Sequence, residues 1–183
     1  MVMDGWKYPE EWKVGDDLNA ETLNSRIRDQ NLVLLKRPLT VAHSAASQVN
    51  AINSWRATTF DTVDIDDDGM VIETLPTTNF YAQRAGIYQV WANVDFRNPG
   101  AANTYALAFW LNGSSGSILY RQQRRMGGFG STIDFCHSIS GIVALGVGEY
   151  IQLNSWNGSG VDVLNLTAIN SCPRIGILWL GPN

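Results

Sequence analysis

Charged side chains are scarce in this sequence. Asp, Glu, Lys and Arg make up 16% of its 183 residues, whereas roughly 25% is usual in a soluble globular domain. We expect so little charge either on a subunit whose surface is covered in an assembly, or on a small β-sandwich with loops rich in Ser, Thr and Asn. The net charge of −4 argues against a nucleic-acid-binding protein, because no run of Lys or Arg dominates the chain.

Long apolar runs and cysteines are also few. No segment approaches the roughly 20 apolar residues that a membrane-spanning helix needs, and residues 1–13 lack the apolar stretch of a secretory signal. We therefore expect a soluble protein that is made in the cytoplasm and does not insert into membranes. The cysteines, Cys136 and Cys172, lie in strand-like segments. We expect two reduced core thiols there, and their spacing leaves a single disulfide open.

The amino-terminal part differs in pattern from the rest. Residues 1–17 have neither helical nor strand periodicity, and their aromatic side chains, among them Trp6 and Trp12, need a surface on which to dock. Residues 19–36 have the pattern of one helix, which Pro38 ends. About two heptads are too few to hold an oligomer alone, and packing of this helix on its own domain is the alternative. The seam consists of Leu23, Ile27, Gln30 and Leu34.

Strand and turn patterns occupy the chain from Trp55 onward. Residues 38–54 have the composition of a connector or of a loosely structured first strand. The alternation of apolar and polar residues is clearest at 87–96. Helices do not alternate with strands, so we expect an all-β, antiparallel sandwich or jelly roll. The other predicted strands are 56–63, 70–75, 79–84, 105–111, 117–122, 132–142 followed by 143–145, 150–156, 161–169 and 174–180.

Several segments, in order, resemble the C1q/TNF-like jelly-roll family. Gly86-Ile87-Tyr88 precedes an alternating strand, and residues 106–113 form a strand that ends in Asn-Gly. Residues 141–153 resemble the family's pair of strands around a Gly-Glu turn, and residues 175–180 resemble its closing strand. This resemblance implies a jelly roll that assembles as a homotrimer.

Two further segments resemble virion proteins of tailed bacteriophages. Residues 60–70 are similar to the opening of C1q-like domains in such proteins, and residues 12–29 look like a leader of tail and fibre proteins. The resemblance implies a structural, host-binding virion component in which 1–37 anchors the trimer, 38–54 connects, and 55–183 faces outward. A tail-tip or fibre position is the leading expectation and capsid decoration the second. The expected anchor and oligomer residues are Trp6, Trp12, Leu23, Ile27 and Leu34. The expected partners are further copies of the chain, other virion proteins and a host cell-surface glycan.

An acidic segment suggests one cofactor. Asp64, Asp66, Asp68 and Gly69 match the first half of an EF-hand calcium loop. The twelfth loop position is Leu75 instead of the bidentate Glu, and no flanking helices are predicted, so a complete EF-hand is excluded. A turn closed by Asp side chains is the alternative. Calcium at Asp64, Asp66 and Asp68 is the only cofactor that the sequence suggests.

No catalytic motif is apparent. His43 and His137 are far apart, and Cys136 next to His137 in a strand points to the opposite face. Patterns for a nucleophile elbow, a phosphate-binding loop or a zinc site are absent. Paired carboxylates stay open, so an enzyme that degrades cell-envelope glycans, or a glycan-binding module, is the alternative function. We expect no catalytic residues.

The seven tryptophans include one candidate for ligand binding. Trp91 and Trp110 lie inside alternating strands, where core or subunit-interface positions are expected. Trp156 and Asn157 begin a glycine-rich loop and are better placed to face a ligand. Three arginines provide the one local cluster of positive charge, which could contact an anionic surface or simply be solvated. The candidate binding residues are Trp156, Asn157, Arg121, Arg124 and Arg125.

Overall fold

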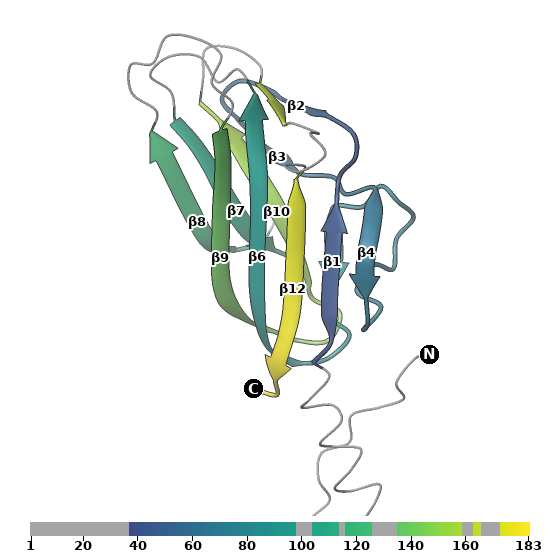
Figure 1. The fold of residues 1–183 in the computed structure, drawn as a ribbon. Coiled ribbons are helices and arrows are strands. Elements are labelled where there is room, and N and C mark those ends of the chain that lie inside the picture. The colour runs from purple at the N-terminus through teal and green to yellow at the C-terminus, as the bar shows by residue number, and fades with distance from the viewer. Residues whose placement is uncertain (1–36, 98–103, 114–115, 126–134, 159–162, 166–172) are drawn as a thin grey trace, which may run out of the picture.

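Two antiparallel β-sheets packed face to face make up the described part of the chain (Figure 1). The computed structural model describes residues 37–97, 104–113, 116–125, 135–158, 163–165 and 173–183. The all-β, antiparallel fold class expected from the sequence is confirmed.

The larger sheet, sheet A, has seven strands in the order β2-β11-β6-β12-β1-β4, and β9 pairs with β6. Its strands are β1 (Leu39–His43), β2 (Gln48–Asn50), β4 (Thr62–Asp66), β6 (Gly86–Arg97), β9 (Phe135–Leu145), β11 (Val163–Asn165) and β12 (Arg174–Gly181). Sheet B has five strands in the order β3-β10-β7-β8, and β5 pairs with β10. Its strands are β3 (Ser54–Ala57), β5 (Asn79–Tyr81), β7 (Thr104–Leu111), β8 (Ile118–Arg125) and β10 (Tyr150–Asn157).

The core lies between the two sheets and is built from alternate residues of the long strands. In β6, Val90, Val94 and Phe96 are fully buried, whereas the intervening side chains point away from the core. In β7, Leu107 and Phe109 face them from sheet B with no exposed surface. Each fully buried side chain of this size contributes roughly 1.5–3 kcal/mol through the hydrophobic effect. This alternation explains why the sequence predicts both strands within two residues.

The domain begins earlier than the sequence predicts. Residues 38–54 were expected to be a connector or a loosely structured first strand, and the structure bears out the second: β1 lies between β12 and β4 in the middle of sheet A. Its inward-facing side chains are Thr40 and Ala42, which are small and at most 1% exposed. Such small residues give no apolar period, which is why the boundary predicted at Trp55 is wrong: among the described residues, the strands of the sandwich begin at Leu39.

The strand predicted over 56–63 is divided between the two sheets. Its beginning lies in β3 of sheet B and its end in β4 of sheet A, and the chain crosses between the sheets at Thr58 to Phe60. The amide of Phe60 donates to the carbonyl of Thr77, and the Phe60 ring is buried in the core. The predicted strand at 70–75 is wrong, because those residues form no strand.

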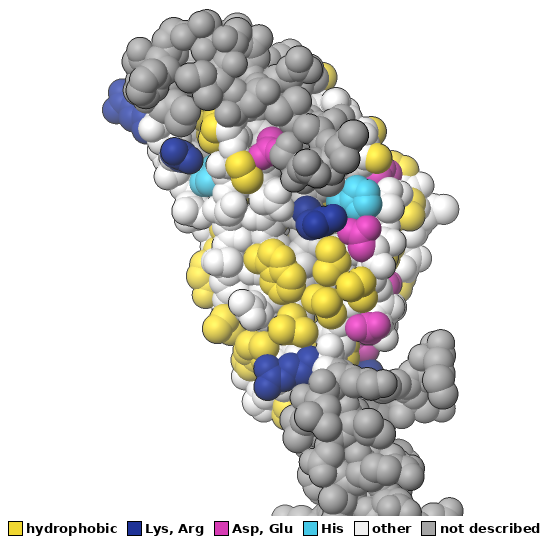
Figure 2. Space-filling model, in the orientation of Figure 1, with side chains coloured by type: hydrophobic (Ala, Val, Ile, Leu, Met, Phe, Trp, Pro, Cys, Tyr) yellow, Lys and Arg dark blue, Asp and Glu magenta, His cyan; other side chains and the backbone are white. Residues whose placement is uncertain are grey.

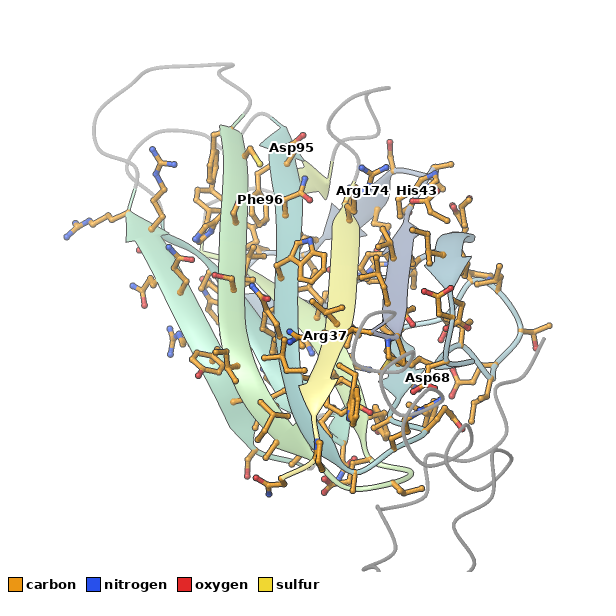
Figure 3. The ribbon with its side chains drawn as sticks, turned by 60° about the horizontal axis from the view of Figure 1, so that its bottom comes forward. Arg37, His43, Asp68, Asp95, Phe96 and Arg174 are labelled. Carbon is orange, nitrogen blue, oxygen red and sulfur yellow. The ribbon has the colours of Figure 1, made fainter. Side chains whose placement is uncertain are left out.

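The described chain begins and ends at the same end of the sandwich. Arg37 precedes β1, which pairs antiparallel with β12, and the amide of Trp179 donates to the carbonyl of Pro38 (Figures 1 and 3). The predicted helix over 19–36, the aromatic arm and Cys172 lie outside the described residues. The predicted anchor residues lie there too, namely Trp6, Trp12, Leu23, Ile27 and Leu34.

Candidate binding surfaces

The outward face of sheet A carries a group of aliphatic side chains. Leu39 of β1 lies opposite Leu178 of β12, and Val41 lies opposite Ile65 of β4. These side chains point outward because their neighbours in sequence, such as Ile177, face the core. Figure 2 shows hydrophobic side chains gathered over the middle of this face. We call this surface the sheet A patch, and it consists of Leu39, Val41, Ile65, Ile87, Trp91, Leu178 and Leu180.

A glycine makes room for the largest side chain of the sheet A patch. Trp91 of β6 lies opposite Gly176 of β12. A β-carbon at Gly176 would overlap the Cζ2 and Cε2 atoms of the Trp91 ring. The ring therefore lies directly on the backbone of β12, and it extends the apolar surface toward β1.

Charged and polar side chains border the sheet A patch near one end of β1. The Nδ1 atom of His43 lies 3.0 Å from Oδ2 of Asp64, and Nη2 of Arg174 lies 3.5 Å from the same oxygen. His43 and Arg174 come from neighbouring strands, as Figure 3 shows. Pairs this accessible to water contribute at most about 1 kcal/mol. A polar border around an apolar centre is the usual anatomy of a protein–protein interface.

A second apolar surface lies along the edge of the sandwich where β8 approaches β9. The hydroxyl of Tyr120 donates to the carbonyl of Ile142 over 2.9 Å, and the Tyr120 ring covers Gly141. Ile118, Tyr120 and Ile142 are 48%, 39% and 58% exposed. We call these three residues the β8–β9 edge.

Three tryptophans stand in contact on the outward face of sheet B. The ring centroid of Trp55 lies 5.8 Å from that of Trp110 and 5.7 Å from that of Trp156, with interplanar angles of 56° and 51°. All three rings are partly exposed. Between them, Ala106 and Ala108 point outward from β7 but have no exposed surface. The rings therefore lie across the sheet and cover its small residues.

Polar side chains flank the three tryptophans. The guanidinium of Arg121 lies 5.5 Å from the ring centroid of Trp55, within the range of a cation–π contact. The amide of Asn154 donates to Gln152 over 3.1 Å, and Gln152 donates to Asn79 over 3.0 Å. These hydrogen bonds hold the amide groups in fixed positions.

A carboxylate lies farther along the same face. Glu73 accepts hydrogen bonds from the hydroxyl of Tyr81 over 2.6 Å, from the amide of Asn79 and from the hydroxyl of Thr77. These bonds hold the pKa of the Glu73 carboxyl below its usual range, and the hydrogen bond to Glu73 raises the pKa of the Tyr81 phenol. The rings of Tyr81 and Tyr150 lie 5.0 Å apart. Aromatic and polar groups thus alternate along sheet B.

Comparison with known proteins gives relatives by structure alone. No protein-family model and no curated protein sequence matches this chain. Murine APRIL at pH 5.0 superposes with a TM-score of 0.59 at 14% identity, over 79% of this chain and 100% of that one. The Eiger TNF of S. frugiperda gives 0.58 at 10% identity, over 80% and 94% of the two chains. The globular domain of zebrafish complement 1qA gives 0.55 at 11% identity, over 80% and 99%.

The fold is a C1q/TNF-like jelly roll. The resemblance in residues 86–88, 106–113, 141–153 and 175–180 therefore predicted the fold correctly. Identities of 10–14% show the fold alone.

The jelly roll brings some of the predicted binding residues together and separates others. Trp156 and Arg121 lie on one face of sheet B, where both contact Trp55. Trp55 was not predicted, because its position opposite Trp156 follows only from the pairing of β3 with β10. Asn157 is fully buried and donates to the carbonyl of Asn50, so its prediction as a surface residue is wrong.

The other two predicted arginines lie near the end of β8. The guanidinium of Arg124 lies 5.7 Å from the ring centroid of Phe135, at the edge facing β9. Arg125 is exposed. Of the three arginines, therefore, the structure places only Arg121 over the tryptophans of sheet B.

The predicted calcium ligands point to three different partners. Asp66 accepts hydrogen bonds from the amides of Met70 and Val71 and from the hydroxyl of Thr40. It therefore closes the turn, as the alternative interpretation predicts. Asp64 lies next to His43 in the polar border of the sheet A patch, whereas Asp68 pairs with Arg84. No cluster of three metal-binding side chains occurs in the described ranges.

Asp68 and Arg84 form the most buried ion pair of the described jelly roll. Nε of Arg84 donates to Oδ1 of Asp68 over 2.7 Å, and the two side chains are 17% and 5% exposed. Burial raises the pKa of Asp68, although the guanidinium works in the opposite direction. Next to this pair, Tyr88 donates to the carbonyl of Arg84, and burial raises the pKa of its phenol to about 12. The pair fixes the acidic loop to the core.

Cys136 and His137 point to opposite faces of β9, as their adjacency in a strand predicts. Cys136 is exposed, so its prediction as a core thiol is wrong. Partial burial is the main cause that raises the pKa of the Cys136 thiol, and a hydrogen bond to Asp95 raises it further. His137 is buried, and burial, with the nearby charge of Arg124, lowers the pKa of its imidazole. The two side chains cannot act as a nucleophile and its base.

Among the described residues, no helix has the length and apolar character to cross a membrane.

Proposed function

We propose that this protein is a homotrimeric structural and binding component of a tailed-bacteriophage particle. The observation that carries the trimer is the sheet A patch, which leaves seven apolar side chains partly accessible on one face of a jelly roll. Contiguous apolar surface of this kind marks an interaction site. Covering it would also account for a chain with only 16% charged residues.

The two separate apolar surfaces of the jelly roll favour a ring over a two-fold dimer. The sheet A patch lies on a face, whereas the β8–β9 edge lies along a border of the sandwich, so the two differ in shape and position. When one surface of a subunit contacts a different surface of the next, the assembly is a ring if the rotation between subunits closes and a filament if it does not. The C1q/TNF resemblance supports a ring of three copies.

Sequence resemblance supports the virion location. Residues 60–70 resemble the opening of C1q-like domains in phage virion proteins, and residues 12–29 resemble a leader of tail proteins. Arg37 leaves the sandwich at the end where the chain terminates. We propose that residues 1–37 anchor the trimer to the particle and that the opposite end of the jelly roll faces the host. Tail tip or fibre is the leading position, with capsid decoration second.

Quantitative mass spectrometry of purified phage particles tests this location. We expect the chain in intact virions at a copy number divisible by three. A few trimers per particle would indicate the tail, and a copy number close to that of the major capsid protein would indicate decoration. Absence of the chain from purified virions would contradict the proposal.

We propose binding in place of catalysis for this domain. His137 is enclosed in the core, and the pKa of the Cys136 thiol is raised, which disfavours the reactive thiolate. Glu73 is held by three hydrogen bonds from neighbouring side chains. If the protein were a glycan-degrading enzyme, it would hydrolyse cell-envelope polysaccharide, and substitution of a catalytic carboxylate would abolish this turnover. We expect no turnover.

A further inference from the structure

The two outward faces of the jelly roll differ in chemistry. The sheet A patch is mainly Leu, Ile and Val, which suits another apolar protein surface. The outward face of sheet B instead presents the three indole rings of Trp55, Trp110 and Trp156 with amide and guanidinium groups beside them. Partners of different chemistry are therefore expected on the two faces.

The tryptophan rings form a twisted platform and not a closed core. Ala106 and Ala108 beneath them leave no side chain that could lift the rings away from the sheet. Each ring is partly exposed, and successive rings are inclined by 51° and 56°. Rings presented in this way offer stacking faces to successive units of a chain-like ligand.

The polar groups beside the platform can both donate and accept hydrogen bonds. The amide of Gln152 accepts a hydrogen bond from the buried Asn154 and donates to Thr78 and Asn79, which fixes its orientation and leaves its oxygen able to accept one more. Arg121 supplies donors alone, and Glu73 supplies acceptors alone. Because these groups are already held in place, a ligand loses little side-chain entropy on binding them.

Sugars match this combination of groups. The face of a pyranose ring presents C–H groups that stack on an indole, and its rim presents hydroxyls that donate and accept hydrogen bonds. We propose that the outward face of sheet B binds a glycan, with pyranose rings stacked on Trp55, Trp110 and Trp156 and hydroxyls bonded to Arg121 and to the amide of Gln152. This proposal deepens the proposed function by naming the partner, and its site lies on the opposite sheet from the sheet A patch.

Binding of the full-length protein to an array of bacterial peptidoglycan strands, capsular polysaccharides and O-antigen polysaccharides tests the proposal. We expect binding to at least one of them. The matching soluble oligosaccharide, titrated by calorimetry, should also change the tryptophan fluorescence. Trp55→Ala and Trp156→Ala should each weaken binding at least tenfold. Val147→Ala, at an exposed turn residue outside both surfaces, is the control, for which we expect an unchanged affinity.

Arg121→Ala provides a variant without risk to folding, because this side chain is exposed. We expect it to weaken binding to the same oligosaccharide several-fold while leaving the circular dichroism spectrum unchanged. The glycan proposal is wrong if no polysaccharide on the array binds, or if Trp55→Ala and Trp156→Ala bind as the wild type does. It is also wrong if Trp156→Ala dissociates the oligomer, because the platform would then be a protein interface.

Failure of this proposal and failure of the proposed trimer give different results. A monomeric wild-type protein that binds the oligosaccharide would refute the trimer and support the glycan site. A trimeric protein that binds none of the polysaccharides would support the trimer and refute the glycan site.

Discussion

The indole ring of Trp91 lies on the backbone of β12 at Gly176, where any β-carbon would overlap it. The side chain that extends the sheet A patch therefore depends on a glycine in the neighbouring strand. This relationship links the sequence to the proposed interface, because a larger residue at position 176 would displace the ring from the surface.

Gly176→Val should destabilise the fold and shift Trp91. Overpacking of this kind costs about 1–3 kcal/mol, measured as the change in the free energy of unfolding by urea. In a Trp91→Ala background the same substitution should cost much less, since the overlapping atoms are gone. Equal costs in the two backgrounds would show that the ring does not occupy the space over Gly176.

Ile142→Asp should weaken the assembly without unfolding the subunit. Ile142 is 58% exposed at the β8–β9 edge, so a carboxylate there stays hydrated in the monomer and becomes buried only in the oligomer. We expect at least a tenfold rise in the dissociation constant, which corresponds to about 1.4 kcal/mol, by analytical ultracentrifugation. Val147→Asp, at a turn residue that is 70% exposed, is the matched control and should change little. Equal effects of the two substitutions would argue against the edge as a contact.

The stability of the fold should fall as the pH drops below about 6.5 because of His137. Burial lowers the pKa of this imidazole in the folded state, so the unfolded chain binds the proton first. Stability is thus present above the unfolded pKa and lost below it, with a slope of up to about 1.4 kcal/mol per pH unit. His137→Phe should remove this part of the slope in urea unfolding between pH 5 and 7. An identical slope in wild type and variant would contradict the assignment.

Asp66→Ala should destabilise the fold to the same extent with and without calcium. The carboxylate accepts two amide hydrogen bonds within its turn and one from Thr40, so its loss should cost about 1–3 kcal/mol. Asp67→Ala, at an exposed neighbour, should stay within about 0.5 kcal/mol of wild type. Thermal melts in EDTA and in calcium provide the measurement. A calcium-dependent rise in wild-type melting temperature that Asp66→Ala abolishes would restore the metal site.

Strands with alternating apolar residues were predictable from sequence, and those with small or polar inward residues were not. Val90, Val94 and Phe96 mark β6 because every second residue enters the core. In β1, Thr40 and Ala42 fill the corresponding positions and leave no apolar pattern. Predicting β1 would have required its pairing with β12, which is distant in sequence.

The local spacing of the aspartates predicted the acidic turn better than it predicted the directions of the side chains in that turn. The alternation of Asp64, Asp66 and Asp68 suggests a shared cation, but tertiary partners determine where each carboxylate points. The Asp68 carboxylate, for example, points toward the core because it pairs with Arg84, which lies 16 residues later in the sequence. The tryptophans of sheet B follow the same rule, since Trp55 and Trp156 meet only through strand pairing.

The molar mass of the full-length protein in solution tests the subunit contact most directly. Light scattering coupled to size-exclusion chromatography should give three times the 20.2 kDa of one chain for wild type. Leu178→Asp places a charge in the sheet A patch while leaving the core unchanged, and it should give the mass of a single folded chain. A monomeric wild type, or a Leu178→Asp variant that stays trimeric, would contradict the account.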